Sequence, residues 1–218
     1  MRSRSEIKAN AREALKEQRI TAILVNIVYF IPYLILIFFI TPMIGRATSI
    51  WVELLADYII MFVVLVVYVG LCYVYMKIYK NEQAEVGEMV HGFYNFGRNF
   101  IAGVLFTVLL ILWTLLLIIP GIIKALSYSW VFFILADSES IGARKSIQAS
   151  MKITKGHKIN ICLFHCSFLG WYLLGLLTFG ILWIVYVIPY HYTSAAGYYM
   201  EMRTEALISG RITAEDLN

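Results

Sequence analysis

Two cysteines and two histidines in the C-terminal third of the chain are the side chains best suited to chemistry. Cys162, His165 and Cys166 are spaced three and four residues apart, which places them on one face of a helix. If the chain folds back at Phe179, His191 lies within one helical turn of that face in depth. Zinc and copper accept thiolate and imidazole ligands, so these four residues could form a metal site.

Two other interpretations of these residues remain open. Cysteines also behave as small apolar packing residues, and histidines in a bundle also bond to hydroxyls such as those of Ser167 and Thr193. Alternatively, His165 and His191, together with Asn26, form a path for protons or a substrate, because histidine titrates near neutral pH. Asn26 lies at the expected cytoplasmic end of its segment, where a bond between helices is the simpler explanation.

Signatures of enzymes are missing from the sequence. It contains no phosphate-binding Gly-x-x-x-x-Gly-Lys, no His-Glu-x-x-His and no Gly-x-Ser-x-Gly. No pair of carboxylates lies within an apolar segment. We therefore expect no catalytic residues, no cofactor and no enzymatic activity.

The elements that carry these residues are apolar segments about as long as a bilayer is thick. Of the 218 residues, 61% are apolar and 15% are charged, against about 25% charged in a soluble domain. Such a composition predicts an all-α, polytopic transmembrane helix bundle. The six expected segments are residues 20–40, 58–78, 100–119 (stopped by Pro120-Gly121), 122–136, 159–177 and 181–200. The fourth is short, at about 22 Å, and could be re-entrant instead.

The distribution of Lys and Arg orients the bundle. Six crossings with a cytoplasmic N-terminus leave 16 of the 18 basic residues inside, with only Arg46 and Lys124 outside. Without the fourth crossing the count becomes nine against nine. The positive-inside rule therefore predicts six crossings, both termini in the cytoplasm and a cytoplasmic tail at 201–218.

Two basic segments predict amphipathic helices at the membrane surface. In residues 1–19, Ser3 and Glu6 form a capping-box pattern, and basic side chains recur every four residues beside an apolar face. Residues 138–158 have a similar mixture. The expected contacts with anionic lipid headgroups are Arg4, Lys8, Arg12, Lys16, Arg144, Lys145, Lys152 and Lys155. The alternative is that the N-terminal segment is a solvated lead-in that only orients the chain.

Several short motifs resemble a known family. They are Ile-Ile-Pro-Gly-Ile-Ile at 118–123, Ser-Tyr at 127–128, Ile-Leu-Ala-Asp at 134–137, Lys-Gly-His-Lys at 155–158, Gly-Trp at 170–171, Pro-Tyr at 189–190 and Gly-Tyr-Tyr at 197–199. The chain thereby resembles the uncharacterised bacterial integral membrane family catalogued as domain of unknown function 975. That family is similar to the membrane domain of some glycerophosphodiester phosphodiesterases. The resemblance implies a multi-pass protein of the bacterial cytoplasmic membrane without an established activity.

Three functional hypotheses follow from these features. The first is a non-enzymatic envelope protein whose partners are the anionic headgroups of the bilayer, a membrane protein or a second copy of the chain, and not nucleic acid. The second is a small transporter or exporter with a polar path near His165 and His191. The third is a membrane-embedded lipid-modifying enzyme.

Overall fold

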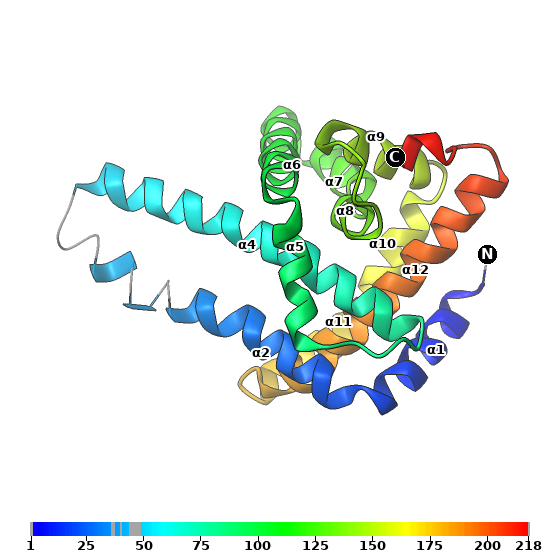
Figure 1. Ribbon diagram of the computed structural model, residues 1–218, viewed down its shortest axis with the longest axis horizontal. Helices are drawn as coiled ribbons and strands as arrows, with labels where there is room; N and C mark the ends of the chain where they lie inside the picture. The colour runs from blue at the N-terminus through cyan, green and yellow to red at the C-terminus, as the bar shows by residue number, and fades with distance from the viewer. Residues whose placement is uncertain (1, 36–37, 40, 44–48, 218) are drawn as a thin grey trace.

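The computed structural model describes residues 2–35, 38–39, 41–43 and 49–217 and is built of helices (Figure 1). Its α-helices are α1 (Arg4–Glu17), α2 (Arg19–Ile35), α4 (Ile50–Tyr79), α5 (His91–Tyr94), α6 (Phe96–Leu116), α7 (Ile118–Ser127), α8 (Val131–Asp137), α9 (Ala143–Ile153), α10 (Lys158–Cys166), α11 (Leu169–Leu177) and α12 (Ile188–Ile208). There are also two 3₁₀ turns, η2 (Val86–Val90) and η4 (Glu215–Leu217), and a π-helical turn, η3 (Trp183–Val187). The described residues 38–39 and 41–43 are helical as well. Arg46 and the last residues of the expected first span, 36, 37 and 40, lie outside the described residues.

Four described stretches are long and apolar enough to cross a membrane. They are Ile60–Tyr79, Phe96–Leu116, Ile118–Asp137 and Lys158–Leu177, and a shorter apolar helix covers Arg19–Phe30. The composition therefore produces an all-α protein of the multi-pass membrane type. The segment expected at 181–200 is not among the four.

Helix α1 has the start and the apolar face that the sequence predicts, but that face contacts protein. The Ser3 hydroxyl accepts from the Glu6 N–H, and the Glu6 carboxylate accepts from the Ser3 N–H at 2.8 Å. Ile7, Ala11 and Ala14 are buried, and α1 packs on α12 and α4. The apolar face of this segment therefore completes the protein core.

The first of two C-terminal hairpins turns earlier than its proline suggests. Helix α6 ends at Leu116, and the extended Leu117 (φ −165°, ψ 143°) reverses the chain. Pro120, expected to stop the third segment, lies instead in the first turn of α7, where a missing N–H costs no hydrogen bond. The fourth segment consequently begins at Ile118. With α8 it reaches 20 residues, longer than the short segment expected.

The second hairpin joins α10 and α11 to η3 and α12. The break between α10 and α11 falls at Ser167 and Phe168. Pro189 is the second residue of α12, and only Ile188 separates it from the π-helical turn. Because proline has no N–H to donate to the preceding turn, a widened turn at this position accommodates it.

The core lies where α12 passes between α1, the second half of α4, and α8 with α9. Its largest fully buried side chains include Trp130, Tyr75, Tyr198 and Tyr199. The basic segment expected as a helix over 138–158 contains the shorter α9. In the expected tail, residues 201–208 continue α12, and the described residues after them pack back, with Leu217 buried. In Figure 1, α2 and the first half of α4 project away from this core.

Candidate functional site

A buried amide connects three helices at the centre of the bundle. Asn26 on α2 is fully buried, and its side-chain nitrogen donates to the Ile184 carbonyl on η3 at 3.2 Å. The Tyr75 hydroxyl on α4 donates to the Asn26 carbonyl oxygen at 2.8 Å. Through these two hydrogen bonds the Asn26 side chain links α2 to η3 and to α4.

The two histidines that the sequence places at one depth are in contact. His165 Nδ1 on α10 lies 3.0 Å from His191 Nε2 on α12, and the other ring nitrogen of His191 lies 2.8 Å from the Tyr172 hydroxyl. The Phe168 ring packs on His191 with ring centroids 4.5 Å apart. Both nitrogens of His191 are therefore engaged, and the cluster ties α10 and α11 to α12.

The two cysteines do not complete a metal site with this pair. Cys162 is half-buried and Cys166 is exposed. Within the described part of the chain, no three His, Cys, Asp or Glu side chains are grouped so as to hold a metal ion. The spacing placed the two histidines at one depth, and the structure adds that their rings are in contact.

Basic side chains of α1 contact the second hairpin directly. Lys8 donates to the Ser167 hydroxyl, and its ammonium lies 4.0 Å from the centroid of the Phe168 ring. The Arg12 guanidinium lies 4.9 Å from the centroid of the Tyr190 ring. Burial, together with the neighbouring Arg12 and Arg4, lowers the pKa of Lys8. These cation–π contacts fix the position of α1 along the hairpin.

A groove of about 160 Å³ lies where α1 and α2 meet the start of α12. Three cations, Arg12, Lys16 and Arg19, line it from the α1–α2 side. The rest of its lining is Leu15, Val185, Tyr186 and Pro189, and it includes no acidic residue. The groove can therefore receive an anionic group attached to an apolar body.

Sequence reasoning found only part of this groove. Arg12 and Lys16 were expected to contact lipid. Arg19 was not, because the basic residues that recur every four positions end at Lys16. The apolar wall comes from η3, about 170 residues away, and nothing in the sequence indicates that contact.

The expected lipid contacts on α9 are only partly available. Lys152 pairs with Asp216 at 2.7 Å, and this contact lowers the pKa of the Asp216 carboxyl. Arg144 and Lys145 are exposed. The main chain of Lys155 accepts from Arg211 at 2.9 Å, while the residue itself is exposed. The end of α9 and the residues just after it are therefore attached to the C-terminal segment.

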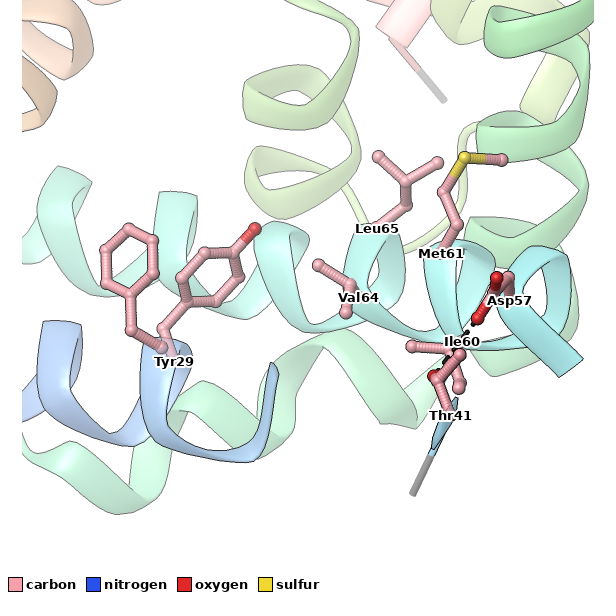
Figure 2. Close-up of a pocket in the computed structure, with 8 residues that line it drawn as sticks. Tyr29, Thr41, Asp57, Ile60, Met61, Val64 and Leu65 are labelled. Atoms are coloured by element: carbon pink, nitrogen blue, oxygen red, sulfur yellow. Dashed lines mark hydrogen bonds between the residues drawn. The ribbon is translucent and has the colours of Figure 1, made fainter. Parts of the chain in front are cut away.

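A second, larger groove of about 610 Å³ separates α2 from α4 (Figure 2). Tyr29, Met61 and Leu65 are among its mostly apolar walls, and Asp57 lies toward one end. The Asp57 carboxylate accepts from the Thr41 hydroxyl at 3.1 Å, as the dashed line in Figure 2 marks. This carboxylate is exposed, and the other residues that line the groove are uncharged.

Together, the long apolar helices and the basic helix at their base define a helical protein of the membrane type. The chain belongs to the family described as "Protein of unknown function (DUF975)", whose model matches residues 1–127 and 114–206. No curated protein and no solved structure matches the chain.

Proposed function

We propose that this protein is a non-enzymatic, multi-pass membrane protein that binds anionic lipids at its basic surface. The observation that carries the proposal is the groove in which Arg12, Lys16 and Arg19 stand over an apolar wall without any acidic neighbour in the lining. A phosphate and the first methylenes of its acyl chains have this combination of charge and apolar surface.

The position of the groove supports a lipid ligand. Arg19 is the first residue of α2, and the next side chain, Ile20, is 75% exposed. An exposed apolar helix that begins directly after a cationic helix is typical of the boundary between headgroups and acyl chains. Each cation near an anionic membrane surface contributes about 1 kcal/mol of attraction.

The transport hypothesis has less support. His165, His191 and Asn26 each hydrogen-bond to neighbouring helices, as described above. The two grooves described above are lined by other residues. Interhelical bonding accounts for all three side chains without a substrate.

The test is the binding of phosphatidylglycerol and phosphatidylcholine to the purified full chain in mixed micelles. We expect preferential binding of phosphatidylglycerol. The variant Lys16→Gln/Arg19→Gln removes two cations from the groove, and at about 1 kcal/mol each this weakens that binding about 30-fold.

The charge-matched control is Arg144→Gln/Lys155→Gln, which removes two exposed cations that do not line the groove. We expect this variant to bind phosphatidylglycerol within about threefold of the unchanged protein. Equal losses in both variants would indicate general electrostatic attraction, and equal binding of the two lipids would contradict the proposal altogether.

A further inference from the structure

The second hairpin ends in a closely packed apolar tip. Helix α11 reverses at residues 178–180, where Phe179 (φ 51°) and Gly180 (φ 85°) adopt left-handed conformations. Gly175 approaches the Trp183 ring so closely that a Cβ atom on it would lie 1.9 Å from the ring. Trp183 also donates its indole N–H to the Tyr172 carbonyl at 2.8 Å. The two arms of residues 169–187 thus form one rigid unit, called here the α11–η3 hairpin.

This hairpin presents apolar side chains outward. The sequence has no charged residue between 169 and 187. Phe179 at the tip is 99% exposed, and Leu177 beside it is 78% exposed. Also exposed are Leu169, Leu173, Leu174, Leu176 and Ile181. Such a surface requires an apolar partner.

Basic residues limit how deeply the hairpin can enter a bilayer. On one arm, Lys8 contacts Ser167 and Phe168. On the other arm, Arg12 contacts Tyr190, and the cationic groove reaches Val185 and Tyr186. At about 1.5 Å per residue, Phe179 lies about 16 Å beyond Phe168 and about 10 Å beyond Tyr186. The hydrocarbon core of a bilayer is about 30 Å thick, so the hairpin reaches only about halfway across.

A full crossing of the hairpin would place these cations in hydrocarbon. At mid-membrane each Lys or Arg costs about 3 kcal/mol, and Lys8, Arg12, Lys16 and Arg19 would all be drawn inward. Snorkelling moves a charge by no more than the length of its side chain, which is shorter than the missing half of the bilayer. Helix α12 is also unsuited to crossing, since α1 lies along it, with Arg2 next to Glu201 and Arg12 next to Tyr190.

The turn itself is adapted to a surrounding without water. Every backbone N–H from Thr178 to Trp183 has an acceptor inside the hairpin. Five of them donate to backbone carbonyls at 3.0 to 3.2 Å, and the Leu182 N–H donates to the Thr178 hydroxyl at 3.1 Å. An unpaired backbone group costs several kcal/mol in hydrocarbon, so the pairing of these six donors lowers the cost of placing the turn there.

We propose that the α11–η3 hairpin is a re-entrant element that enters one leaflet, the leaflet on the side of α1, and returns to the same side. Its partner is the acyl-chain layer of that leaflet, with Phe179 near the bilayer midplane. Helix α12 then lies on the cytoplasmic side of this hairpin. Both ends of the segment stay on one side, so the count of 16 basic residues inside and two outside is unchanged.

The test uses single cysteines in a cysteine-free background (Cys72→Ala, Cys162→Ser, Cys166→Ser) and a membrane-impermeant maleimide applied to oriented vesicles. Asn10→Cys on α1 and Leu117→Cys at the α6–α7 turn mark the two sides. We expect Phe179→Cys to react at least tenfold more slowly than the marker on whichever side receives the maleimide. We expect it to become reactive in detergent. Ile181→Cys is a second reporter on the same tip.

A nitroxide attached at position 179 in nanodiscs identifies what surrounds the tip. We expect strong collision with oxygen, which dissolves in lipid, and weak collision with a water-soluble nickel complex. Maleimide labelling of Phe179→Cys from the Leu117→Cys side would show a full crossing, and labelling from the Asn10→Cys side would show a hairpin outside the bilayer. Shielding from both oxygen and nickel would show a protein partner, and each of these three results overturns the proposal.

Discussion

At the scale of single residues, polar side chains in this protein join helices that are remote in sequence. Asn26 bonds to η3 and accepts from Tyr75, and His191 uses both ring nitrogens within the second hairpin. The sequence predicted that His165 and His191 share a depth, because a hairpin with a known turn fixes the level of each residue. It could not predict the contacts of Asn26, because those depend on which helices are neighbours.

We expect Asn26→Leu to destabilise the bundle by about 1–2 kcal/mol. The change leaves the Ile184 carbonyl without its donor, and it leaves the Tyr75 hydroxyl with only the longer bond to the Ala22 carbonyl at 3.3 Å. The measurement is the thermal unfolding midpoint in detergent. Asn10→Leu, at an exposed position on α1, is the control and should leave the midpoint nearly unchanged.

The burial of His91 should make the free energy of unfolding depend on pH. Its ring stacks on Tyr73 with centroids 3.9 Å apart, and burial lowers its pKa. The unfolded chain takes up this proton near the ordinary pKa of about 6.5, whereas the folded protein resists protonation. This contribution to stability is therefore present at neutral pH and is lost as the pH falls below about 6.5.

The measurement is the unfolding midpoint of the unchanged protein and of His91→Phe between pH 7.5 and 5. Phenylalanine keeps a ring against Tyr73 and does not titrate. We expect the midpoint of the variant to fall less steeply with acidification. Identical slopes would mean that His91 contributes nothing to the pH dependence.

At the scale of elements, helix boundaries follow local contacts that the apolar pattern does not reveal. Most apolar segments were predicted to within a few residues, since composition decides them. The turn at Leu117 and the break near Tyr128 were missed, because an extended residue and a short interruption inside an apolar run leave hydropathy unchanged. The sixth segment was predicted as a span from its apolar and aromatic residues, many of which are buried in protein instead.

Two glycines of α11 provide a matched test of how the hairpin packs. A Cβ atom on Gly175 would overlap the Trp183 ring, whereas a Cβ atom on Gly170 would have no neighbour within 4 Å. We expect Gly175→Ala to cost about 1–3 kcal/mol through overpacking. Gly170→Ala should be neutral or slightly stabilising, since alanine favours a helix. Thermal unfolding of the two variants compares them, and equal midpoints would contradict the close packing of the two arms.

At the scale of the whole molecule, the basic N-terminal helix belongs to the folded core. Its amphipathic pattern places Ile7, Ala11, Ala14 and Leu15 on one face, because helical periodicity decides which side chains share a face. All four side chains are buried. The sequence does not say what covers that face. A membrane surface and another part of the protein satisfy the same pattern, and the structure places α12 and α4 there.

Substitution of Ile7 separates these two roles of α1. Ile7 is fully buried in the core, and Ile7→Ala removes apolar contacts and leaves a cavity, at a cost of about 2–4 kcal/mol. If α1 only rested on the membrane, the same change would weaken bilayer association and leave unfolding of the bundle unaltered. The control is Ile20→Ala, because Ile20 is an exposed isoleucine just beyond α1. We expect a lower unfolding midpoint in detergent for Ile7→Ala and little change for Ile20→Ala. This is the result expected if α1 is part of the folded core and packs on α12 and α4.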